Sequence, residues 1–224
     1  MKQTLVIVTI AHSPRSDITP LLLEHLPEEQ ILRVSLLEGL SAEEIEEKYA
    51  PEEHERTLVT HLPDGSPFTL SADKVEEGLQ QLIWRLEAQG TETILLLGYA
   101  ADRLQTHSAV LLEPDRIVPP LVKAIVDGHQ VGVMISAEDP LRQQAIKWRN
   151  LSHPARFAVA SPYHNDNETL IDAALQLQEQ GADVVVLDSP GYHQRHRDCL
   201  QQLLGIPVLL SHVLLAKIAA ELLV

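Results

Sequence analysis

The stretch that most constrains the fold is residues 183–198, DVVVLDSPGYHQRHRD. Four consecutive apolar residues, from Val184 to Leu187, leave no polar face. They predict a strand that is covered on both sides, as in the centre of a parallel sheet. A tight Asp-Ser-Pro-Gly turn follows, and a helix rich in histidine and arginine comes after it. Open α/β folds bind ligands beyond the carboxyl ends of such strands. The sequence therefore predicts a site at this turn.

The rest of the chain alternates strand-like and helix-like patterns. Short apolar runs bounded by turn residues alternate with longer amphipathic segments, which is typical of βα units around parallel sheets. The predicted strands are 4–10, 31–37, 93–98, 109–112, 130–136, 156–160, 183–188 and 207–210. The predicted helices are 18–26, 72–89, 115–127, 138–150, 167–180, 193–204 and 211–224.

The two halves of the chain share a plan. Each opens with an apolar strand and a polar loop, at 6–17 and 131–140, and each later has a strand that ends in a distinctive loop, at 94–102 and 184–192. We therefore predict an α/β fold of two similar parallel-sheet halves with a cleft between them.

The predicted halves are residues 1–128 and 129–224, and a return of the C-terminal helix to the first half is left open. The first half carries extra residues that fit 37–71. Ser41 and Glu44 have the spacing of a capping box, and Asp64-Gly65 is typical of a hairpin turn. We predict a helix-plus-hairpin insertion there, outside the common βα plan.

Composition narrows the partners. The formal net charge of −15 argues against nucleic acid and anionic membranes, because phosphate binding needs clustered cations. The apolar run at the N-terminus is short and ends in a loop, which indicates a first strand and not a signal peptide. A lone cysteine, Cys199, excludes an internal disulfide and is expected to be a buried structural thiol. We expect a cytoplasmic protein without a metal or a cofactor; whether it forms a homo-oligomer is left open.

The candidate site residues gather at the predicted strand ends. His193 is the candidate catalytic acid or base, because histidine changes charge near neutral pH. Ser189 stands where a nucleophile or hydrogen-bond donor would stand, and Arg15 with the helix N-termini would hold an anion. The residues expected to bind the substrate are His12, Ser13, Arg15, Gly98, Tyr99, Ser136, Gly191 and Tyr192.

Plainer readings of the same residues stay open. Ser189 also suits an ordinary βα turn, and His196 and Arg197 could simply pair with Asp198. A zinc site at His193 and His196 would have no HExxH motif or cysteine partner to supply the usual third protein ligand, although Asp188 could help. Motifs for dinucleotide binding, for the phosphate-binding P-loop and for α/β-hydrolases are absent from the sequence.

Several long motifs resemble one family. They are YAPE at 49–52, LEPDRIVPPLV at 112–122, HQVGVMI at 129–135, QGADVVVLD at 180–188, GYHQRHRD at 191–198 and PVLLSHVLLAKIAAELLV at 207–224. On these motifs the chain resembles the AroM family of bacterial proteins nearly end to end. That resemblance implies an association with the genes of aromatic amino-acid biosynthesis, but it implies no particular reaction.

A more distant likeness is to the aspartate/glutamate and hydantoin racemases and their decarboxylase and isomerase relatives. It implies two similar α/β halves, with one cysteine at a strand end in each half acting as acid and base beside a carboxylate. The matching places here lie near Gly98-Tyr99 and near Ser189, and neither holds a cysteine. A serine hydroxyl has a far higher pKa than a thiol, so we expect no racemisation of aspartate, glutamate or hydantoins.

The resulting hypothesis is a racemase-like protein that binds a small carboxylate or another anionic metabolite in an interdomain cleft. Isomerase or lyase activity next to a carboxyl group is left open. The alternative is a non-catalytic metabolite-binding or regulatory protein linked to aromatic amino-acid biosynthesis, and a third is a purely structural partner.

Overall fold

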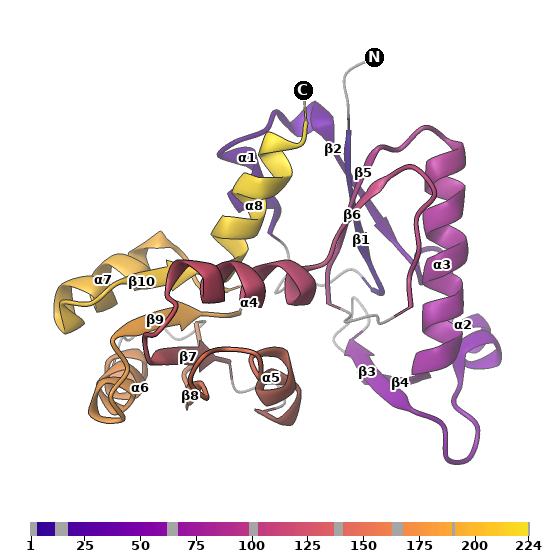
Figure 1. The fold of residues 1–224 in the computed structure, drawn as a ribbon. Coiled ribbons are helices and arrows are strands. Elements are labelled where there is room, and N and C mark those ends of the chain that lie inside the picture. The colour runs from indigo at the N-terminus through magenta and orange to yellow at the C-terminus, as the bar shows by residue number, and fades with distance from the viewer. Residues whose placement is uncertain are drawn as a thin grey trace. The chain divides into compact units, whose positions relative to one another are not determined.

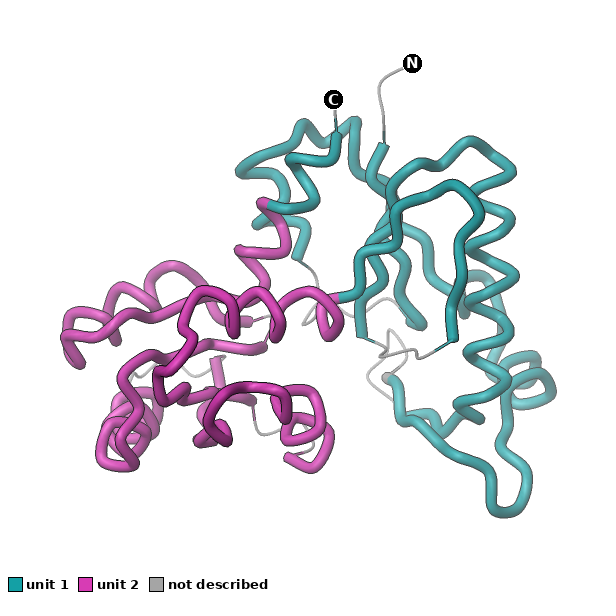
Figure 2. Tube along the Cα trace, viewed as in Figure 1, with its two compact units in different colours: residues 1–113, 218–224 teal, residues 114–217 magenta. Residues whose placement is uncertain are grey.

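The structure is a computed structural model that describes residues 4–11, 18–61, 67–98, 103–136, 141–162, 168–189 and 191–223. The chain divides into two compact units, which Figure 2 shows in different colours. Unit 1 holds residues 1–113 and 218–224, and unit 2 holds residues 114–217.

Unit 1 is built on a four-stranded parallel sheet in the order β2-β1-β5-β6. The strands of the unit are β1 (Leu5–Thr9), β2 (Ile31–Ser35), β5 (Thr93–Leu96) and β6 (Val110–Leu112), together with β3 (Thr57–His61) and β4 (Pro67–Ser71), which pair only with each other. Its helices are α1 (Thr19–Leu23), the short η2 (Glu28–Gln30), α2 (Ala42–Tyr49) and α3 (Ala72–Ala88). The apolar side of α3 packs with Val6, Val8 and Ile94 of the sheet. Figure 1 shows this long helix beside the sheet of unit 1.

Unit 2 repeats the design with a second four-stranded parallel sheet, in the order β10-β9-β7-β8. Its strands are β7 (Val131–Ile135), β8 (Arg156–Val159), β9 (Val184–Leu187) and β10 (Val208–Leu210). Its helices are α4 (Pro114–Ile125), α5 (Leu141–Lys147), α6 (Glu168–Glu179), α7 (Gln194–Leu204) and α8 (Ser211–Glu221), whose last residues belong to unit 1. Strands β7 and β9 are buried along their whole lengths, as the apolar run at 184–187 predicts.

The predicted repeat is confirmed by the sheet topology. In each parallel sheet the first strand of the unit lies between the second and the third, and the fourth strand lies beyond the third. The helix and hairpin at 42–71 are the elements of unit 1 that have no counterpart in this order. The two-stranded antiparallel sheet of β3 and β4 stands apart from the parallel sheet, so the predicted insertion is also confirmed.

Local sequence signals explain where two helices of unit 1 begin. The Ser41 hydroxyl accepts from the backbone N–H of Glu44 at 3.2 Å, while the Glu44 carboxylate accepts from the Ser41 N–H at 2.7 Å. This is the capping box that the sequence predicts. The Ser71 hydroxyl caps α3 in the same way, by accepting from the N–H of Lys74.

Helix α4 lies in unit 2, whereas the sequence predicts it in the first half, which is expected to end at residue 128. Its residues Val118 and Val122 pack in one apolar cluster with Val131 and Val133 of β7. This burial ties the helix to the sheet that follows it. Among the described residues, no helix is long and apolar enough to cross a membrane.

One glycine of the central strand β7 allows close packing of α6. A Cβ atom added at Gly132 would lie 3.0 Å from the Ala182 Cβ and 3.2 Å from the Leu177 Cδ1. Real Cβ atoms rarely come so close, so a larger residue would push the helix away from the sheet.

We expect Gly132→Ala to lower the free energy of unfolding by about 1–3 kcal/mol, because the added methyl group overpacks the interface. Urea denaturation of the purified variant measures this loss. The double variant Gly132→Ala/Ala182→Gly should recover part of this stability, since it removes the Ala182 methyl group that the new Cβ would crowd. A single variant as stable as the natural protein would contradict the close-packing account.

Candidate functional site

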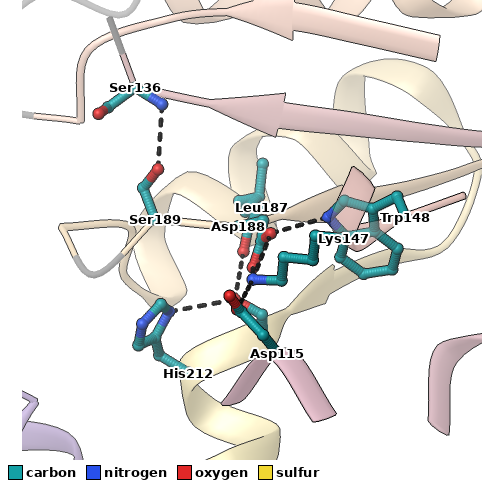
Figure 3. Close-up of polar contacts among 9 residues, drawn as sticks. Asp115, Ser136, Lys147, Trp148, Leu187, Asp188, Ser189 and His212 are labelled. Atoms are coloured by element: carbon teal, nitrogen blue, oxygen red, sulfur yellow. Dashed lines mark hydrogen bonds and ion pairs between the residues drawn. The ribbon is translucent and has the colours of Figure 1, made fainter. Parts of the chain in front are cut away.

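Two of the predicted site residues meet at the carboxyl edge of the sheet in unit 2. Strands β7 and β9 are parallel neighbours with Met134 opposite Leu187. Ser136 follows β7 and Ser189 follows β9. The backbone N–H of Ser136 donates to the Ser189 Oγ at 3.0 Å (Figure 3). Both residues are buried. The hydrogen bond therefore fixes the ends of the two central strands relative to each other.

A buried acidic side chain lies next to Ser189. The side chain of Asp188 is only 1% exposed and lies against Lys147 and Trp148 at the end of α5. Its Oδ2 is 2.9 Å from the Lys147 Nζ and accepts from the Trp148 Nε1–H, also at 2.9 Å (Figure 3). A buried carboxylate is costly unless it is paired and hydrogen-bonded. Asp188 satisfies both conditions.

Lys147 bridges two carboxylates. Its Nζ is 2.8 Å from the Oδ1 of Asp115, at the start of α4, in addition to its contact with Asp188. Burial by itself would lower the pKa of Lys147, but the charges of Asp188 and Asp115 together raise that pKa above its ordinary value. The ammonium group is therefore protonated throughout the physiological range.

Sequence reasoning missed Lys147, Trp148 and Asp115 as part of this edge. One signal was present, because Asp188 directly follows four apolar residues of a strand predicted to be buried. A carboxylate in that position needs a cation and hydrogen-bond donors. The pattern does not say which of the 17 lysines and arginines of the chain supplies the charge.

A third strand end of unit 2 also carries polar side chains. Ser211 follows β10, and its Oγ donates to the Leu187 carbonyl oxygen at 3.2 Å. A carbonyl can only accept, so the same Oγ accepts from the His212 Nδ1, which lies 3.1 Å away. The bonding thus assigns the hydrogen of a neutral His212 to Nδ1 and leaves Nε2 as the basic nitrogen. Sequence reasoning did not single out this histidine.

The segment 191–196 separates into buried and exposed parts. Tyr192 is buried, and its hydroxyl donates to the Ala160 carbonyl oxygen at 2.7 Å. His193, the predicted acid or base, is exposed at the start of α7. Its backbone N–H donates to the Nδ1 of the buried His196 at 3.0 Å, and the two rings stack. Arg197 pairs with Asp198 at 2.7 Å, as its plainer reading holds, whereas the partner given for His196 is the His193 N–H.

Two glycines among the other predicted site residues lie in the described part of the chain. Gly191 is buried beside Tyr192. Gly98 is exposed after β5 in unit 1 and has a φ of 75°, a conformation that favours glycine. The remaining predicted residues lie outside the described part of the chain; they are His12, Ser13, Arg15 and Tyr99.

Two further expectations concern Cys199 and metals. Cys199 is half-buried, so the expectation of a fully buried thiol is wrong. The helix α7 turns this residue toward its margin and not toward the core side that holds His196 and Leu200. In the described residues, no group of three or more histidine, cysteine, aspartate or glutamate side chains could hold a metal ion.

Comparison with protein families matches residues 5–223 to the AroM protein family. The chain belongs to the AroM family. The match covers nearly all of the chain, as the motifs in the sequence predict. No curated protein matches the chain significantly.

Solved structures show the fold that this AroM-family chain shares with others. Unliganded arylmalonate decarboxylase is similar with a TM-score of 0.57 and 12% identity, over 98% of this chain and 92% of that chain. An aspartate racemase homologue from Pyrococcus horikoshii OT3 gives 0.60 and 12%, over 99% of both chains. Allantoin racemase from Klebsiella pneumoniae gives 0.56 and 12%, over 98% of this chain and 87% of that chain. The predicted racemase-like fold is confirmed.

His196, a buried histidine in the first turn of α7, makes the stability of the fold depend on pH. Burial, with added repulsion from Arg195 and His193, lowers the pKa of His196 from its ordinary 6.5 to about 4. Between these values the unfolded chain binds a proton that the folded chain does not. The neutral ring therefore stabilises the fold fully above pH 6.5, and this contribution is lost as the pH falls toward 4.

We expect His196→Asn to remove this pH dependence, because an asparagine can still accept from the His193 N–H but does not titrate. Urea denaturation at pH 6.5 and at pH 4.5 measures the effect. Over that interval the natural protein should lose about 2 kcal/mol more stability than the variant does. Equal losses would show that His196 keeps an ordinary pKa in the folded protein.

Proposed function

We propose that this AroM-family chain binds a small carboxylate at the carboxyl edge of the sheet in unit 2, around Ser136, Ser189 and Gly191. The observation that carries the proposal is the hydrogen bond between the Ser136 N–H and the Ser189 Oγ. It holds the ends of two central parallel strands together, at the edge where open α/β sheets bind ligands.

The surroundings of the two serines support an anionic ligand of small size. Gly191, which has no side chain, lies two residues after Ser189 in the chain, and an exposed histidine, His193, stands at the start of α7. The similar structures point to the same chemical class, since aspartate and arylmalonate, named for two of them, both carry carboxylate groups.

The residue type at position 189 favours binding over racemisation. A serine hydroxyl has a pKa far above that of a thiol, and it cannot readily take a proton from carbon at neutral pH. Isomerase or lyase chemistry would need another base, for which exposed His193 is our candidate. The second candidate function, a non-catalytic metabolite-binding protein of aromatic amino-acid biosynthesis, rests on this same serine.

We expect malonate, phenylmalonate, aspartate or shikimate to raise the melting temperature of the purified protein. A ligand at one hundred times its Kd stabilises the folded state by about 2.7 kcal/mol. For a chain of this size that is a rise of roughly 5–11 °C. Differential scanning fluorimetry with each compound measures it, and malonamide serves as the uncharged control for malonate.

Two variants locate the binding. Ser189→Ala should weaken the response to the active compound, because it removes the hydroxyl at the proposed site. Ser152→Ala should leave the response unchanged, since Ser152 is an exposed serine of the same unit that pairs with Asp127. If none of the carboxylates shifts the melting temperature, or if malonamide acts as strongly as malonate, the proposed function fails.

A further inference from the structure

We propose that Lys147 is a positioning residue for ligand charge: it cancels the buried charge of Asp188, which would otherwise repel an anion at the position of Ser189. This inference rests on the proposed function and extends it, because it names the residue that sets the charge preference of the edge. Three features of the described residues support it.

The first feature is where the negative charge lies. Asp188 directly precedes Ser189 on the chain, and its side chain is 1% exposed. Water therefore screens this carboxylate very little. Without a partner, its charge would repel any anion that approached Ser189.

The second feature is the counter-charge. The Lys147 Nζ contacts both oxygens of Asp188, at 2.9 Å from Oδ2 and 3.2 Å from Oδ1. The Lys147 side chain is itself only 10% exposed, so the pair is shielded from solvent as a unit. Asp115, on the other side of the ammonium group, is 40% exposed and is therefore more strongly screened.

The third feature is that the pair is held in one geometry. Trp148, the next residue after Lys147, donates its indole N–H to Oδ2 of Asp188, the oxygen that lies nearer to the Lys147 Nζ. The indole is buried, so it anchors the end of α5 beside the carboxylate. On the other flank, the Leu187 carbonyl accepts from Ser211, which also holds His212.

The size of the effect follows from Coulomb's law. Two like unit charges about 8 Å apart, at an effective dielectric constant of about 20, disfavour each other by a factor of about thirty. An unpaired Asp188 would thus weaken the binding of a carboxylate at Ser189 by about thirtyfold. Lys147 removes this repulsion without lying in the ligand position itself.

A thiol placed at position 189 measures the local charge without any ligand. The starting protein is Cys199→Ser/Ser189→Cys, whose lone thiol titrates by the ultraviolet absorbance of its thiolate. Cys199→Ser with Ser189 retained supplies the background. The titratable groups near the site include Lys147, Asp188, Asp115, His212 and the exposed His193, and only the first two are varied.

Adding Lys147→Met should raise the pKa of the new thiol by about 1.5, because an unpaired Asp188 carboxylate opposes the thiolate. Adding Asp188→Asn as well should return the pKa to its starting value. Lys147→Arg keeps the charge and should leave the pKa near the starting value. A pKa that stays unchanged in Lys147→Met, or stays high in the double variant, overturns the inference.

Where Lys147→Met does not fold, Asp188→Asn alone gives the opposite test. It leaves the ammonium group in place and should lower the pKa of the thiol, and an unchanged or higher pKa overturns the inference. Malonate binding separates the two proposals. Shifted thiol pKa values with no malonate binding by the natural protein would refute the proposed function only. Malonate affinity equal in the natural protein and Lys147→Met, with an unshifted thiol, would refute the role of Lys147 only.

Discussion

The contact between Lys147 and Asp188 is the interaction on which the candidate site depends. Strand β9 is apolar along its whole length and must be covered on both faces. The chain therefore leaves the sheet at a buried point. At that point the sequence places a carboxylate, which requires a cation and hydrogen-bond donors. Lys147 and Trp148 supply them from the end of α5. The pair thereby fixes the backbone just before Ser189.

Parallel pairing explains why these polar side chains gather at one edge of the sheet. In a parallel sheet every strand leaves at the same side, so the residues after β7, β9 and β10 become neighbours although they are far apart in sequence. Those residues are Ser136, Asp188-Ser189 and Ser211-His212. Three hydrogen bonds link them to one another or to the strands, and the edge is therefore a connected polar layer over an apolar core. Unit 1 uses the same strand order.

The sequence was sufficient for the fold because its signals are local and agree with one another. The apolar runs predicted every strand of the parallel sheets, and Ser41 with Glu44 predicted the start of α2. The site was only partly predictable. Ser136 and Ser189 are candidates from the sequence because they follow buried strands, and the register of two parallel strands brings them together. Lys147 was missed because a lysine on a short amphipathic helix looks like a surface residue. Only the packing of α5 against the strand end shows that its ammonium group is buried.

Tyr192 shows a second limit of prediction from sequence. A tyrosine after a glycine turn has the composition of a ligand contact, yet its ring is buried and its hydroxyl is bonded to the Ala160 carbonyl oxygen. Composition does not distinguish these two cases, because both need an apolar ring and a polar tip. The hydroxyl's partner, Ala160, follows β8 in unit 2, and the sequence around Tyr192 gives no sign of it.

The central claim is that the ends of β9 and α5 are joined by a buried charge pair. A double-mutant cycle of Lys147→Met and Asp188→Asn, followed by urea denaturation, tests it most directly. Lys147→Met leaves the Asp188 carboxylate buried without its cation and should lower the free energy of unfolding by about 3–5 kcal/mol. Asp188→Asn leaves Lys147 paired with Asp115 and should lower the free energy of unfolding by less. The double variant should lose much less than the sum of the two, with a coupling energy of at least about 2 kcal/mol. Losses that add to within about 0.5 kcal/mol would show that the two side chains do not interact in the folded protein, and would contradict the account.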